Sequence, residues 1–257
     1  MKLAKDQIAR QFSRAASTYD QAAQLQTKMA TRLIDAIPAD AAGALVELGC
    51  GTGWALKEIE QTGRFTLTAV DLAPGMIEIA RSRVPAATFH CCDLEKTPLD
   101  NNSADVVFSN AAIQWCDAAE AFREMQRICK PRGHIFVSTF GPSTFHELRS
   151  AWRDASDTNN RVHEFESTQQ IESAMLELGL QNVSVETTDE VIQFDSVDGL
   201  LQSIKQLGAT NASTKRQTGL LGTKRYRKFR QVFDQRLTDD GHLTLTFESV
   251  FAFAQKH

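Results

Sequence analysis

The first forty residues carry apolar side chains at helical spacing. These positions recur every three or four residues: Ala22, Leu25, Met29, Leu33 and Ile37. Pro38 follows directly, and a proline commonly ends a helical pattern. We therefore expect residues 1–40 to form helices that precede the main domain and cover part of it.

From Gly43 onward, short apolar runs alternate with helical segments. Strands are expected at 44–48, 65–70, 87–90, 104–109 and 133–140. Between them, helices are expected to start at Trp54 and Pro74 and to span 117–130. Such alternation implies right-handed crossovers and a parallel sheet with helices on both faces.

Two long strands are expected near the end of the chain, at 183–194 and 243–256. A polar, basic and mostly helical insertion, 195–240, separates them. The pattern predicts an α/β fold with a doubly wound, mostly parallel, seven-stranded sheet. We expect one domain over 1–257, with its core at 44–194 and its last strand within 242–257.

Composition narrows the class of protein. The chain has 257 residues, of which 42% are hydrophobic and 23% charged, as in ordinary soluble globular proteins. It shows neither an apolar run of about 20 residues nor a signal peptide, so we expect a cytoplasmic protein. The five cysteines lack metal-ligand spacing, which favours a protein without a metal. A net charge of −4 disfavours nucleic acid as a partner.

Candidate ligand-binding residues lie at four successive strand ends. The first is a glycine loop that follows Glu47: Gly49, Gly51 and Gly53. The others are Asp71, Asp93 and Asn110. Ligands of open α/β sheets bind at such ends, where an acid can accept hydrogen bonds from ribose hydroxyls or from an adenine amine. Taken singly, either aspartate could equally be a turn or helix cap.

Position 54 decides between two ligand classes. The dinucleotide fingerprint requires a third glycine there, whereas the sequence has Trp54. A nicotinamide-dependent enzyme is therefore the weaker alternative. The ordered segments VELGCGTG, VDLAPGMI, CDLEKTPL and SNAAIQW resemble the class I S-adenosylmethionine-dependent methyltransferases, which have a Rossmann-like fold.

That resemblance implies S-adenosyl-L-methionine as cofactor and S-adenosyl-L-homocysteine as product. In such enzymes the glycine loop packs against the methionine portion, while acids corresponding to Asp71 and Asp93 bind ribose and adenine. Leu72, Met76 and Leu94 would enclose the adenine ring.

The flanking segments are more specific. FSRAASTYDQAAQLQ, which contains Tyr19 and Gln26, resembles the malonyl-acyl carrier protein O-methyltransferases of biotin synthesis, as do GPSTFHELRSAW, IKQLGATN and LTLTFESVFAFAQK. The resemblance implies methyl transfer to the free carboxylate of a malonyl thioester on acyl carrier protein. It also adds Tyr19 and Gln26 to the cofactor-binding set. The alternatives are methylation of another small acid or a quinone ring, and a cofactor-binding regulator without catalysis.

A carboxylate acceptor needs orientation but no general base, because it is already ionised at neutral pH. We expect Tyr19, Gln114 and Trp115 to face the mouth of the cofactor pocket, and Arg149 to be the first candidate for holding the carboxylate. An exposed helix charge is an equally good interpretation of Arg149.

The segment 213–231 is the most basic stretch of the chain. Tyr226, Phe229 and Phe233 share one helical face and are expected to pack inward. The basic residues around them are candidates for docking an acidic carrier protein: Lys224, Arg225, Arg227 and Lys228. A solvated charged helix without a partner is the alternative.

Overall fold

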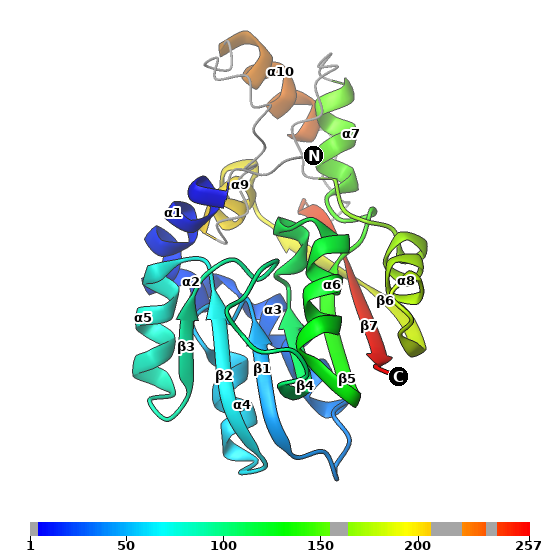
Figure 1. Ribbon diagram of the computed structural model, residues 1–257. Coiled ribbons are helices and arrows are strands. Elements are labelled where there is room, and N and C mark those ends of the chain that lie inside the picture. Colours follow the sequence, from blue (N-terminus) through cyan, green and yellow to red (C-terminus); the bar gives the residue numbers. More distant parts are fainter. Residues whose placement is uncertain (1–4, 155–163, 207–222, 235–240) are drawn as a thin grey trace.

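The structure is a computed structural model that describes residues 5–154, 164–206, 223–234 and 241–257. Within these residues, seven strands form one sheet in the order β3-β2-β1-β4-β5-β7-β6 (Figure 1). Their bounds are β1 Gly43–Leu48, β2 Phe65–Asp71, β3 Thr88–Cys91, β4 Ala104–Asn110, β5 Cys129–Phe140, β6 Gln181–Phe194 and β7 Leu243–Gln255.

The first five strands are parallel, whereas β7 runs antiparallel to both of its neighbours, β5 and β6. All seven strands expected from the sequence are present, and the prediction of a doubly wound, mostly parallel sheet is confirmed. The helix expected over 117–130 ends at Ile128, and β5 begins at Cys129, earlier than expected, because Cys129 pairs with Ala104 before a register shift.

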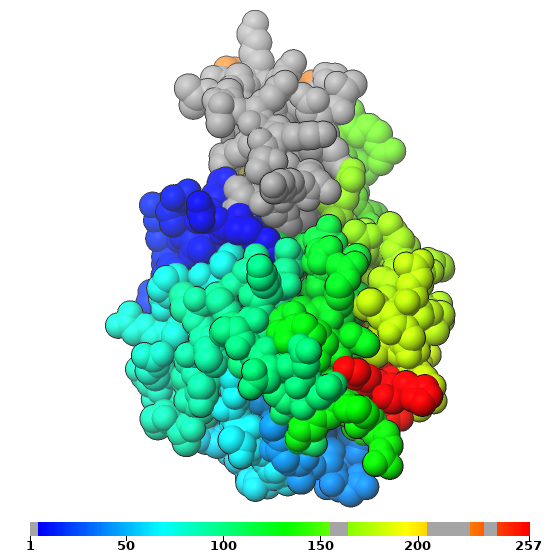
Figure 2. Space-filling view, viewed as in Figure 1, coloured from blue at the N-terminus to red at the C-terminus, as the bar shows by residue number. Residues whose placement is uncertain are grey.

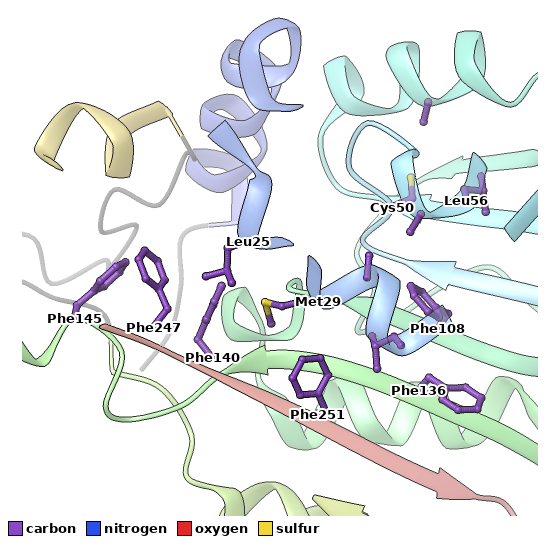
Figure 3. Packing of buried hydrophobic residues seen from close by; sticks show 14 of the residues in the cluster. Leu25, Met29, Cys50, Leu56, Phe108, Phe136, Phe140, Phe145, Phe247 and Phe251 are labelled. Atoms are coloured by element: carbon purple, nitrogen blue, oxygen red, sulfur yellow. The ribbon is translucent and has the colours of Figure 1, made fainter. Parts of the chain in front are cut away.

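Two hydrophobic cores cover the faces of the sheet, because successive strand residues point to opposite sides. One face packs against α3 Gln24–Asp35, α4 Trp54–Gln61 and α5 Pro74–Arg83. The other packs against α6 Ala118–Ile128 and α8 Thr168–Glu177. In Figure 3, Leu25 and Met29 of α3 point toward Phe140 and Phe251 on β5 and β7.

The remaining described helices gather at the end of the sheet where the parallel strands terminate (Figure 1). They are α1 Lys5–Ala15, η1 Ala16–Thr18, α2 Tyr19–Ala22, η2 Ile113–Trp115, α7 His146–Asp154, α9 Val197–Gln206 and α10 Thr223–Asp234. Helices α9 and α10 belong to the expected insertion, of which 207–222 and 235–240 lie outside the described residues. Figure 2 shows the N-terminal segment packed against the surface that contains α5.

Candidate active site

The glycine loop joins β1 to α4, and all three of its glycines have positive φ angles. Gly49 and Gly51 have φ angles of +79° and +53°, which side chains disfavour. A Cβ on Gly49 would lie 2.3 Å from Cβ of Ala112, whereas one on Gly51 would meet no protein atom within 4 Å. Gly49 thus allows the β4 loop to approach, and Gly51 leaves space open beside the loop.

Asp71 ends β2 and holds this loop. Its carboxylate accepts one hydrogen bond from the N–H of Gly51 and one from the N–H of Ala73, both at 2.8 Å. Burial raises its pKa, although the backbone N–H groups act in the opposite direction. A carboxylate has about four lone-pair sites, so it can also accept a hydrogen bond from a ligand hydroxyl. Asp71 is therefore a turn cap that can also bind a ligand.

A cavity of about 650 Å³, open mouth included, lies between the ends of β1 and β4, where the strand order reverses. This is the position at which open α/β sheets bind ligands. Ten of the predicted site residues line it: Tyr19, Gly49, Gly51, Asp71, Leu72, Met76, Asp93, Leu94, Asn110 and Trp115.

Residues 5–22, which we call the strap, form the outer wall of the cavity. Phe12 of α1 contacts Trp115 and Tyr19 edge-on, with ring centroids 5.6 and 6.2 Å apart. At the start of the strap, Lys5 Nζ lies 3.1 Å from Asp93 Oδ1 and also pairs with Glu95. The strap thus starts at Asp93, after β3, and passes along the wall of the cavity.

Several cavity residues were not predicted from the sequence: Lys5, Ile8, Ala9, Phe12, Ala73, Ala111, Ala112 and Cys116. Phe12 lies in the segment that carries the flanking resemblance and could have been included on that basis. Lys5 has no such signal. Ala111 adopts a φ of +48° directly after β4, a conformation that the sequence does not reveal.

Five predicted residues are not among those that line the cavity: Gln26, Glu47, Gly53, Gln114 and Arg149. Gly53 caps α4 and packs against Ala80. The backbone carbonyl of Gln26 accepts a hydrogen bond from Nδ2 of Asn110 at 3.0 Å. Within the described residues, Gln26 Oε1 and Glu47 Oε2 are buried and have no hydrogen-bond partner.

The side chains of Gln114 and Arg149 donate hydrogen bonds to backbone carbonyls in this structure. Nε2 of Gln114 donates to the carbonyl of Ala111 at 2.7 Å. The Arg149 guanidinium donates to the carbonyls of Pro142 and Thr144, and burial lowers its pKa. Its role in holding the substrate carboxylate stays a prediction, for which this placement gives no support.

Helix α10 matches the expected inward and outward faces where its side chains are described. Phe229 and Phe233 are buried, and the Phe229 ring stacks on Trp152 with centroids 3.9 Å apart. Arg227 and Lys228 are exposed. The side chains of Lys224, Arg225 and Tyr226 lie outside the described part of the chain.

Two protonated donors of the cavity, Tyr19 and Cys116, lie near acidic side chains. Burial raises the pKa of the Tyr19 phenol, with Asp71 and Asp20 adding to the effect, so Tyr19 keeps its proton at neutral pH. Burial likewise raises the pKa of the Cys116 thiol. Among the described residues there is no cluster that could hold a metal ion and no helix long and apolar enough to cross a membrane.

Glu47→Gln is expected to alter how stability depends on pH. Burial, and then the charge of Asp71, raise the pKa of Glu47 well above its ordinary value. The folded protein therefore retains a proton that the unfolded chain releases, so the parent loses stability as pH rises from about 4.3 toward the folded-state pKa. The Glu47→Gln variant has no carboxyl group at this position, so it does not lose stability in this way.

The free energy of unfolding of each protein is measured with urea between about pH 4 and 8. As pH rises, the value for Glu47→Gln should increase relative to the value for the parent. We expect the difference to increase across this range, because the unfolded chain releases the proton of Glu47 and the folded protein retains it. Glu172→Gln, at an exposed position of α8, is the matched control. A difference between parent and Glu47→Gln that does not change with pH would contradict this prediction.

Comparison with known proteins identifies the family. A family model described as a methyltransferase domain matches residues 46–137. The malonyl-acyl carrier protein O-methyltransferase of Dechloromonas aromatica is 34% identical, over 98% of this chain and 95% of that protein. The biotin biosynthesis bifunctional protein BioHC of Saccharophagus degradans is also 34% identical, over 96% of this chain and 46% of that protein.

A solved structure agrees on the fold. Phosphoethanolamine N-methyltransferase 2 of Haemonchus contortus, in complex with S-adenosyl-L-methionine, superposes with a TM-score of 0.60 at 19% identity. The match covers 95% of this chain and 57% of that one. The predicted methyltransferase fold and the predicted S-adenosylmethionine-dependent enzyme class are confirmed. The chain belongs to the malonyl-acyl carrier protein O-methyltransferase family.

Proposed function

We propose that this protein transfers the methyl group of S-adenosylmethionine to the free carboxylate of malonyl-acyl carrier protein, giving the malonyl methyl ester that primes pimelate and biotin synthesis. The observation that carries the proposal is the cavity at the β1/β4 switch point, where the glycine loop meets two strand-end acids in a chain of this family.

The cavity fits the cofactor on its own geometry. Gly51 leaves open space beside the loop, and Asp71 can also accept a hydrogen bond from a ligand hydroxyl. The residues that would hold the cofactor are Gly49, Gly51, Asp71, Leu72, Met76, Asp93 and Leu94.

S-adenosylmethionine supplies an electrophilic methyl group, so the protein's own contribution is orientation and exclusion of water. The acceptor carboxylate is ionised at neutral pH and needs no proton removed. Tyr19, Phe12 and Trp115 form the wall that shields the reacting groups from solvent. Esterification removes a charge that would be costly to bury in the apolar pockets of chain-elongating enzymes.

The direct test is incubation of the protein with S-adenosylmethionine labelled in the methyl group and malonyl-acyl carrier protein. We expect label on the malonyl group as a base-labile ester, and none on carrier protein that lacks malonate. Cofactor binding without any methyl transfer would favour the alternative of a cofactor-binding regulator without catalysis. Methyl transfer to a quinone or to another small acid, with none to malonyl-acyl carrier protein, would favour a methyltransferase with a different acceptor.

The rate of methyl transfer is expected to be flat from about pH 6 to 8 because the acceptor has a solution pKa near 4. The described residues that line the cavity include no histidine, and Tyr19 stays protonated in this range. Single-turnover measurement with saturating cofactor would show the chemical step. A loss of rate below pH 7 would require a catalytic base and would contradict a carboxylate acceptor.

A further inference from the structure

Tyr19 lines the cavity and belongs to a short segment whose conformation is not stable by itself. Helix α2 has four residues, and so short a helix is unstable without tertiary contacts. The segment between Ala15 and Gln24 also changes from α1 through a 3-10 turn to α2 within a few residues. Contacts outside the segment must therefore set the position of Tyr19.

The next residue, Asp20, makes such contacts. Oδ1 of Asp20 accepts a hydrogen bond from Oγ1 of Thr52 at 2.6 Å, and Oδ2 accepts one from Nη2 of Arg83 at 2.5 Å. Nη1 of Arg83 also donates to Oγ1 of Thr52 at 3.1 Å. The three side chains form a closed triangle in which each is bonded to the other two.

The triangle joins three elements that build the cavity. Asp20 belongs to the strap, Thr52 is the residue between Gly51 and Gly53, and Arg83 ends α5, whose first turns supply Met76. Thr52 is only 3% exposed, so its hydroxyl depends on these partners. None of the three lines the cavity, and any effect on a ligand must pass through their neighbours.

We propose that Asp20 is a positioning residue, which ties the strap to the glycine loop through Thr52 and Arg83 and so fixes Tyr19 against the bound cofactor. An exposed ion pair alone is worth little, but here the carboxylate accepts two hydrogen bonds, one from a charged donor and one from a buried hydroxyl. Losing it frees the strap at the glycine-loop end, while Lys5 still holds the other end at Asp93.

The first test measures the Kd of S-adenosylmethionine by calorimetry, without any methyl acceptor. Asp20→Asn keeps the shape of the side chain and removes its charge, and Thr52→Val keeps the shape and removes the hydroxyl. Both are expected to raise the Kd roughly tenfold, which corresponds to about 1.4 kcal/mol. Thr52→Ser keeps the hydroxyl and should bind the cofactor like the parent.

The matched control is Glu60→Gln, which breaks a side-chain ion pair of similar exposure with Lys57 at 2.7 Å on α4. A merely structural role for Asp20 predicts that Asp20→Asn and Glu60→Gln lower the thermal midpoint and leave the Kd unchanged. That result, or an equal change of Kd in both, would overturn the proposal.

The second test is a double-mutant cycle with Tyr19→Ala. If Asp20 acts by fixing Tyr19, removing the ring should cost less affinity in the Asp20→Asn background than in the parent. Losses of affinity that multiply would show that the two residues act independently and would overturn the proposal.

The inference rests on the proposed cofactor site. A parent protein that does not bind S-adenosylmethionine would refute that site, whereas a binding parent with unaffected variants refutes only the role of Asp20.

Discussion

Gly51→Val is expected to raise the Kd of S-adenosylmethionine at least about 100-fold, or about 2.8 kcal/mol. Gly51 lines the cavity, and a Cβ built on it meets no protein atom within 4 Å. The added side chain would therefore project into the space that the cofactor needs. Calorimetric titration of the folded variant measures the loss.

The control for this variant must carry the same backbone strain. A side chain at a φ of +53° costs roughly 1 to 2 kcal/mol whatever surrounds it. Gly63, in the turn before β2, has a φ of +66° and would likewise place a Cβ in open space, but it does not line the cavity. Gly63→Val should lose similar stability and bind the cofactor normally. If both variants bound the cofactor with the same affinity, the glycine loop would not be part of the cofactor site.

Asp71→Ala is also expected to weaken cofactor binding, but its effect has two sources. In the parent, the Asp71 carboxylate accepts hydrogen bonds from the N–H groups of Gly51 and Ala73, and it is also the predicted acceptor for ribose hydroxyls. Removing it would disturb the glycine loop along with any ligand contact. Gly51 is the sharper probe because a side chain there changes the space in the cavity without removing a hydrogen bond.

The sheet and the strand-end residues could be predicted because both follow from local pattern. Alternating strands and helices fix the crossover direction, and parallel strands bring Gly51, Asp71, Asp93 and Asn110 to one edge. The insertion of β7 between β5 and β6 is a pairing between distant segments, which periodicity does not encode.

The wall of the cavity was harder to predict because it depends on how helices pack across the sheet. An amphipathic pattern indicates that α1 buries one face, but it does not say that Phe12 meets Trp115 or that Lys5 reaches Asp93. Arg149 shows the opposite problem. Its charge suggested a carboxylate site, yet its guanidinium donates to carbonyls of the loop before α7, a contact that no residue pattern predicts.

The basic side of α10 is proposed to dock the carrier protein. Helices α7, α9 and α10 lie at the same end of the sheet as the cavity (Figure 1). Phe229 and Phe233 anchor α10 through their buried rings, while Arg227 and Lys228 are exposed. Acyl carrier proteins are strongly acidic, so exposed cations at this end of the sheet would attract and orient the carrier that delivers the malonyl group.

Reversing both charges, as Arg227→Glu with Lys228→Glu, is expected to raise the KM for malonyl-acyl carrier protein roughly tenfold or more, about 1.4 kcal/mol. The effect should shrink at high ionic strength because salt screens exposed charges. Turnover of malonyl-coenzyme A, which presents a far smaller anionic carrier, should fall much less. The control variant, Lys28→Glu with Lys57→Glu on α3 and α4, changes the net charge equally on the helices that cover the sheet face. Equal losses on both thioesters, or the same loss in the control, would place the docking surface elsewhere.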